Sequence, residues 1–107
     1  MNTYPFTLPK GIIDSQGIKH DRGLMRMTTG IDELCWQQDF HTQENKAYGI
    51  AILLSRTVMA IGEITTIDKN TIENLLLNDF RYLVDFYNQI NPKAAKISVL
   101  GKKWAIL

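Results

Sequence analysis

The sequence predicts an α+β protein in which a small N-terminal antiparallel β meander is followed by an antiparallel two-helix hairpin. Residues 3–28 contain short apolar stretches with turn residues between them, which is typical of antiparallel strands. Residues 44–61 and 69–90 carry apolar residues at a helical spacing, and the connection between them is short. A chain of 107 residues can bury one core, so we expect one domain over 1–92 and a C-terminal tail over 93–107.

The N-terminal region is expected to form three short strands. The first strand contains Pro5 and Pro9, which confine it to a sheet edge or to its ends, because proline has no N–H to donate to a ladder. Turns are expected at residues 14–17 and 21–23, where Asp and Gly favour chain reversal. A further strand over residues 24–28 would complete the meander.

Two helices are expected next. A short helix should form around residues 31–37, with Thr29 as its N-cap and Asp32 in its first turn. The first long helix should span about 44–61 as a largely buried element, since Arg56 is the single charge over most of its length. This run is too short and too interrupted to cross a bilayer, which requires roughly 20 apolar residues.

The second long helix is expected over residues 69–90, from an N-cap at Asp68 to a stop at Asn91–Pro92. Its polar residues form one narrow stripe, and apolar residues fill most of the remaining circumference. This apolar arc is wider than one packing partner requires. The helix is therefore either sandwiched inside its own domain or offers a face to another chain.

The residues at the edges of this apolar arc are the candidate partner contacts. Leu77, Phe80 and Val84 lie at one edge, while Tyr82 and Phe86 lie toward the other. The alternative for each of the five is an ordinary position in the protein's own core.

The charge is distributed unevenly along the chain, although the total is only +1. Residues 1–91 carry eight Lys/Arg and eleven Asp/Glu, a difference of −3, whereas residues 92–107 carry four lysines and no acid. This balance argues against a generally basic nucleic-acid-binding protein. The tail is either a solvated terminus or a docking segment, and its apolar residues, with Trp104 as a candidate partner contact, favour docking.

Asp79 is the one charge inside the apolar arc of the second long helix. A carboxylate in that position must be paired or hydrogen-bonded. Arg56 is its natural partner across the helix hairpin, and Arg26 is the alternative. We expect a structural ion pair between Asp79 and Arg56 that fixes the register of the hairpin, in preference to a catalytic acid or an intermolecular contact.

The sequence offers no catalytic constellation. His20, Cys35 and His41 stand at spacings that match no metal motif, and no glycine-rich phosphate loop is present. A single cysteine excludes an internal disulfide framework and fits a reducing compartment, and the chain start lacks a signal-peptide pattern. We therefore expect a cytoplasmic, non-enzymatic protein that uses no cofactor or metal and binds neither nucleic acid nor membrane.

A series of landmarks, taken together in order, resembles a known family. They are Phe6-x-Leu8, Gly11, Gly17-Ile18-Lys19-His20, Met25-Arg26-x-x-Thr29-x-x-Asp32-Glu33, Asn45-x-x-Tyr48, Leu53-Leu54-Ser55-Arg56, Ile61-Gly62, Ile72-Glu73, Asp79-x-x-x-Leu83 and Tyr87-x-x-Ile90-Asn91. Their order over roughly residues 5–92 is similar to that of the Mu-like phage tail assembly proteins, or tail assembly chaperones, which are also encoded near contractile injection systems.

This resemblance implies a non-enzymatic assembly factor of a phage tail or a related contractile particle. Such chaperones are thought to bind the long, helical tape-measure protein before tube subunits polymerise around it. The alternative is a permanent structural subunit of a tail, baseplate or contractile injection particle. The wide apolar arc of the second long helix agrees with either kind of protein partner, and the oligomeric state is left open.

Overall fold

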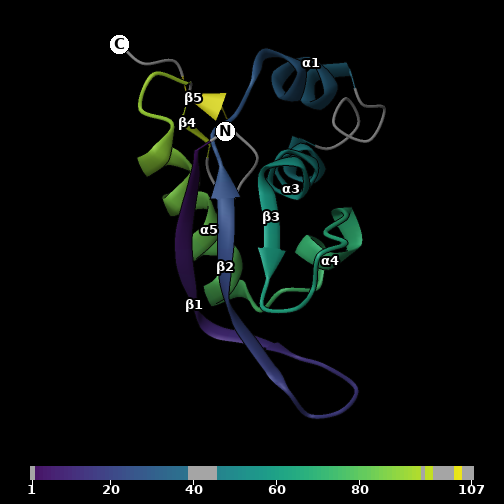
Figure 1. Cartoon of the computed structure of the whole chain (residues 1–107). Helices are drawn as coiled ribbons and strands as arrows, with labels where there is room; N and C mark the ends of the chain where they lie inside the picture. Colours follow the sequence, from purple (N-terminus) through teal and green to yellow (C-terminus); the bar gives the residue numbers. More distant parts are fainter. Residues whose placement is uncertain (1, 39–45, 95, 98–102, 105–107) are drawn as a thin grey trace.

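The computed structural model describes residues 2–38, 46–94, 96–97 and 103–104 of the chain. The described chain forms strands and helices (Figure 1). They are, in order, β1 (Thr3–Ile13), β2 (Lys19–Arg26), α1 (Gly30–Gln38), α3 (Lys46–Thr57), β3 (Val58–Ile61), α4 (Lys69–Glu73), α5 (Leu77–Ile90), β4 (Lys96–Ile97) and β5 (Lys103–Trp104).

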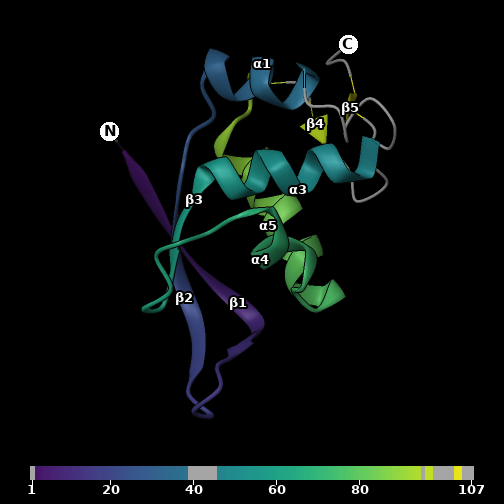
Figure 2. The ribbon, with the colours of Figure 1, turned by 90° about the vertical axis from the view of Figure 1, so that its right-hand side faces the viewer.

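The main sheet is antiparallel with the order β1-β2-β3, so the predicted α+β class is confirmed. The helices lie on one side of this sheet, and the long β1–β2 hairpin extends past them at the end opposite to α1 (Figure 2). The strands β4 and β5 pair with each other in a separate two-stranded sheet. Within the described helices, no segment is long and apolar enough for a membrane span.

The strand β1 lies at a sheet edge, which is one of the two placements that its prolines allow. The backbone N–H of Thr7 points away from β2 and donates to the hydroxyl of Tyr82 at 3.3 Å. Because the N–H direction alternates along a strand, Pro5 and Pro9 occupy positions on the same outer edge as Thr7. The two prolines have no N–H to donate, and the N–H of Thr7 is already bound by Tyr82. This edge therefore has little capacity to pair with another strand.

The turn expected at residues 14–17 is present, but the turn expected at 21–23 is not, because β2 continues through it. Gly23 is needed there for close packing of the strands, not for a turn. A Cβ atom at this position would collide with the ring of Phe6 and with the carbonyl oxygen of Ala60. A glycine in the central strand therefore lets β1 and β3 close in from both sides.

The first long helix ends earlier than predicted, because α3 stops at Thr57 and the next four residues form β3. Val58 and Ile61 are buried in the sheet layer, and Gly62 leaves the strand with a φ of +60°. A short buried apolar run has the same sequence pattern in a helix as in a strand. Pairing with β2, which lies far away in the sequence, decides between the two.

The second long helix is broken into α4 and α5. The predicted N-cap is confirmed, since the Asp68 carboxylate accepts the Thr71 N–H at 2.9 Å. The break follows Asn74, whose side-chain amide donates to the Asn70 carbonyl at 2.8 Å, and Leu76 is extended with ψ of 149°. The predicted two-helix hairpin is thus only partly correct: β3 intervenes, and α3 packs mainly against α1 and α4.

The core lies between the sheet and the helices. Met25, Leu54 and Leu83 are fully buried within it, and Ile97 joins it from β4. The Asn88 side chain accepts the Ile97 N–H and donates to the Ile97 carbonyl, each at 2.9 Å. The first residues of the expected tail are therefore attached to α5.

Replacing Gly23 by alanine should destabilise the protein by about 1–3 kcal/mol, because the new methyl group overpacks the centre of the sheet. Gly30→Ala is the matched control, since a Cβ atom at Gly30 meets nothing within 4 Å. Its effect should stay within about 0.5 kcal/mol. Urea denaturation measures both values, and equal stabilities of the two variants would contradict the packing role of Gly23.

Candidate functional site

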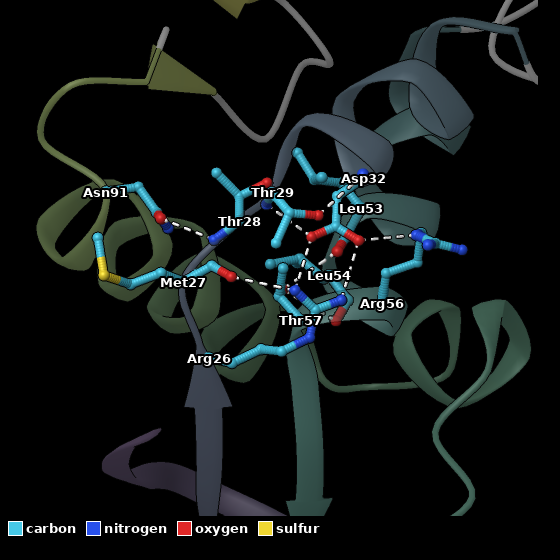
Figure 3. A network of polar contacts seen from close by, with 10 residues as sticks. All are labelled: Arg26, Met27, Thr28, Thr29, Asp32, Leu53, Leu54, Arg56, Thr57 and Asn91. Carbon is cyan, nitrogen blue, oxygen red and sulfur yellow. Dashed lines mark hydrogen bonds and ion pairs between the residues drawn. The ribbon is translucent and has the colours of Figure 1, made fainter. Parts of the chain in front are cut away.

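A buried carboxylate, Asp32, joins three elements at the end of the sheet nearest α1 (Figure 3). Arg26 at the end of β2 donates two hydrogen bonds, of 2.7 Å to Oδ2 and 2.9 Å to Oδ1. Arg56 in the last turn of α3 donates from Nε to Oδ1 at 2.8 Å. One carboxylate thus holds a strand end and a helix end against α1 through charge-assisted bonds.

The same carboxylate completes the start of α1. The Thr29 N–H donates to Asp32 Oδ2 at 2.8 Å, and the Thr29 hydroxyl accepts the Asp32 N–H at 3.4 Å. This reciprocal arrangement is a capping box with Asp in place of Glu. The predicted N-cap at Thr29 is therefore confirmed, and Asp32 in the first turn serves the network as well as the cap.

This network favours the charged forms of Asp32 and Arg26. Burial alone would raise the pKa of Asp32, but the hydrogen bonds from Arg26, Thr29 and Arg56 outweigh it and hold the pKa well below its usual range. The hydrogen bond to Asp32 raises the pKa of Arg26 in turn. Asp32 is thus a structural group that is ionised at neutral pH, and an acid of this kind has no proton to give there.

The predicted ion pair between Asp79 and Arg56 is wrong, and Arg26 is not the partner of Asp79 either. Asp79 is fully buried and accepts the backbone N–H groups of Lys10 at 2.8 Å and Gly11 at 2.9 Å. These two amides lie at the irregularity of β1, where the ladder with β2 is interrupted and Gly11 adopts a φ of +86°. Asp79 therefore replaces the missing ladder bonds and ties the edge strand to the first turn of α5.

The candidate partner contacts on α5 differ widely in exposure. Leu77 is 59 % exposed, whereas Val84 is 3 % exposed and belongs to the protein's own core, so the prediction of a partner contact is wrong for Val84. Phe80 is partly buried against the core. Helical phase alone cannot distinguish an apolar residue that faces the sheet from one that faces solvent.

The aromatic candidates Tyr82 and Phe86 pack within the chain. Their rings stack with centroids 6.0 Å apart, and the Phe6 ring of β1 lies 5.7 Å from Phe86 and 6.3 Å from Tyr82. Both side chains are half-buried, and the Tyr82 hydroxyl is bound to β1. The side chain of Trp104 lies outside the part of the chain that the structure describes.

A histidine–carboxylate pair escaped the sequence analysis. His20 is 6 % exposed, and its Nε2 lies 2.8 Å from Asp14 Oδ2. Its Nδ1 accepts the Glu63 N–H at 3.3 Å, so the hydrogen-bond network assigns the proton to Nε2. Through His20, the pair connects the hairpin to the loop after β3. The hydrogen bond with His20 is the main cause that lowers the pKa of Asp14.

Among the described residues, no group of three His, Cys, Asp or Glu side chains could hold a metal ion. Cys35 is half-buried on α1, and His41 lies outside the described residues. The polar side chains described above form helix caps, bind the backbone of the edge strand or form ion pairs. Among the described residues, exposed apolar side chains and an open cleft are the features that a ligand could contact.

An open cleft of about 700 Å³ lies beside α1. Residues 27–30 with Glu33 and Gln37 form one wall, and residues 91–94 form the other. Asn91 connects the two walls, because it accepts the Thr28 N–H at 2.9 Å (Figure 3). Its side-chain amide also donates to the Tyr87 carbonyl at 2.8 Å. The sequence carries no local signal for this cleft, since its walls come from distant segments.

No family model matches this chain, and neither a curated protein nor a solved structure matches it. The resemblance to tail assembly proteins therefore stays a prediction that depends on the order of sequence landmarks.

Replacing Asp32 by asparagine should destabilise the protein by about 3 kcal/mol or more, because two guanidinium groups lose their buried counter-charge. The pH dependence of the protein's stability should also change in this variant. Since the pKa of Asp32 is lowered on folding, its contribution is complete above the unfolded pKa of about 4 and is lost as the pH falls below it.

Urea denaturation of the wild type and the variant between neutral and acidic pH measures this effect. The stability difference between the two proteins should shrink as the pH falls below about 4. A difference that is independent of pH would contradict an ionised Asp32.

Asp79→Asn should cost about 1–3 kcal/mol, because an amide can accept only one of the two backbone N–H groups and its NH₂ then faces a donor. Asp85→Asn is the matched control, an exposed carboxylate on the same helix. Thermal denaturation compares the two, and the control should change stability by no more than about 0.5 kcal/mol. Equal melting temperatures would show that Asp79 does not hold β1.

Proposed function

We propose that this protein is a non-enzymatic, cytoplasmic assembly factor that binds a helical protein partner, in keeping with its resemblance to phage tail assembly chaperones. The partner would be a tape-measure protein or another tail or baseplate protein of a contractile particle. The polar clusters described above are engaged in structure. The chemistry that is left for function is therefore the burial of apolar surface.

The observation that carries the proposal is the exposed apolar pair at the junction of α4 and α5. Leu76 is 58 % exposed and Leu77 is 59 % exposed, and Phe80 follows one turn later. Large apolar side chains that cluster on a monomer surface are typical of protein interaction sites. An amphipathic partner helix could lay its apolar face against this patch of Leu76, Leu77 and Phe80.

The second candidate is a permanent structural subunit of such a particle. The observation that favours it is the attachment of the chain after Pro92: Ile97 is buried in the core, and the described residues continue into the β4–β5 pair. A basic segment anchored in this way can order on a neighbouring subunit. Purified mature particles discriminate the two, since fixed stoichiometric presence favours the subunit and absence favours the transient factor.

The patch is tested by co-expression with a phage tape-measure protein, the partner that the resemblance implies. Leu76→Asp and Leu77→Asp should each reduce co-purification at least about tenfold, because an interfacial leucine contributes about 1.5–3 kcal/mol. Both variants should melt close to the wild type, since exposed positions tolerate substitution.

The matched control is Leu34→Asp, an exposed leucine on α1 that is 52 % accessible and lies outside the patch. It should leave co-purification unchanged. Undiminished co-purification of the two patch variants, or an equal loss in the control, would refute the patch as the docking surface.

A further inference from the structure

A buried histidine joins the β1–β2 hairpin to the loop that follows β3. His20 is 6 % exposed, and both of its ring nitrogens have a partner. Nε2 lies 2.8 Å from Asp14 Oδ2, and Nδ1 accepts the Glu63 N–H at 3.3 Å. Because a ring nitrogen that accepts a hydrogen bond carries no proton, these contacts define a neutral imidazole with its proton on Nε2.

Gly62 brings the loop directly against this ring. A Cβ atom at Gly62 would collide with Nδ1, Cβ and Cγ of His20, so a side chain at this position would push the loop away. The Gly62 N–H also donates to the Arg22 carbonyl of β2. The backbone of the loop is thus held beside the imidazole, and the Glu63 N–H faces Nδ1 at close range.

The charged groups around the imidazole act on its two nitrogens differently. Asp14 faces Nε2 from the turn, and its pKa is lowered chiefly by this hydrogen bond, so it stays ionised where histidines titrate. Lys19 and Asp21 flank the histidine on β2 and pair with each other at 3.8 Å. From β1, Ile12 lies opposite and brings no charge. The exposed residue Glu63 meets the ring with its backbone N–H, so Nδ1 faces a donor.

We propose that His20 is a pH-sensitive latch that holds the loop after β3 on the hairpin when it is neutral and releases the loop when it is protonated. Nε2 keeps its proton and its contact with Asp14 in both states, so the second proton comes from solvent to Nδ1. Two N–H groups then face each other, and the hydrogen bond from Glu63 is lost. Asp14 stabilises the imidazolium where it is, so the loop moves away and the ring stays.

The latch sets how firmly the outer half of the hairpin is attached to the body of the protein. Asp79 holds β1 at Lys10 and Gly11 through contacts that do not involve the histidine. Opening of the latch therefore loosens the hairpin beyond that point, together with the start of the loop that leads to α4. Histidine is the side chain that ordinarily changes charge between about pH 5 and 8, so a latch of this kind responds near neutral pH.

NMR spectroscopy of the ¹⁵N-labelled protein between about pH 8 and about pH 5 tests the latch. The neutral His20 ring should show a protonated Nε2 and an unprotonated Nδ1. As Nδ1 takes up a proton, the Glu63 amide proton should move upfield with the same midpoint. Its protection from hydrogen exchange should fall about two- to tenfold, as expected for one neutral hydrogen bond. The Ile64 N–H, which donates to the Ile61 carbonyl at 2.9 Å, is the internal control and should not follow this midpoint.

Asp14→Asn reverses the ring's proton without acid. The side-chain oxygen is needed by the N–H groups of Gln16 and Ile18, so the new NH₂ group faces Nε2. Nε2 must then accept, and the proton moves to Nδ1. The Glu63 hydrogen bond should therefore be lost already at neutral pH. Asp21→Asn is the matched control, an acid next to the histidine in the sequence, and it should keep that bond.

Four results would overturn the proposal. They are a neutral wild-type ring with its proton on Nδ1, a His20 ring that stays neutral down to about pH 5 in the folded protein, a Glu63 amide that does not respond when the ring is protonated, and a folded Asp14→Asn variant that keeps the Glu63 bond at neutral pH. Dispersed amide spectra show that each variant is folded. The titration of the wild type decides the question even if a variant does not fold.

Discussion

The buried carboxylate of Asp32 is the constraint on which the rest of this structure depends. It binds the end of β2 and the start of α1, which are close in the sequence, to the end of α3, which lies 24 residues further along the chain. Because α3 runs directly into β3, fixing the end of α3 also fixes where the third strand meets the sheet. One ionised group thus sets the relative position of the sheet and two helices, at the cost of desolvating three charges together.

Asp79 is the buried carboxylate that anchors the opposite end of the domain. It takes over two backbone donors where β1 leaves the ladder, and it couples that irregularity to the first turn of α5. The hairpin therefore leaves the body from a defined point. The leucine pair that precedes Asp79 by two and three residues is held in a defined place by the same bond.

The sequence predicted the features whose physics is local. The caps at Thr29 and Asp68, the turn at residues 14–17 and the edge position of β1 each depend on a few neighbouring residues. It did not predict β3 or the break after Asn74, because pairing with β2 decides the first and side-chain capping the second. The predicted ion pair between Asp79 and Arg56 was wrong for a related reason. Each of two buried aspartates required donors, but a helical projection cannot show that backbone amides satisfy one and both arginines the other.

The ionisation of Asp32 in the folded protein tests this account most directly. The ¹³Cγ chemical shift of Asp32 can be followed from neutral to acidic pH. The account predicts that Asp32 stays ionised in the folded protein well below the ordinary aspartate pKa of about 3.9. A midpoint for Asp32 at or above that ordinary value in the folded state would contradict it, because the two arginines would then not be holding an ionised carboxylate.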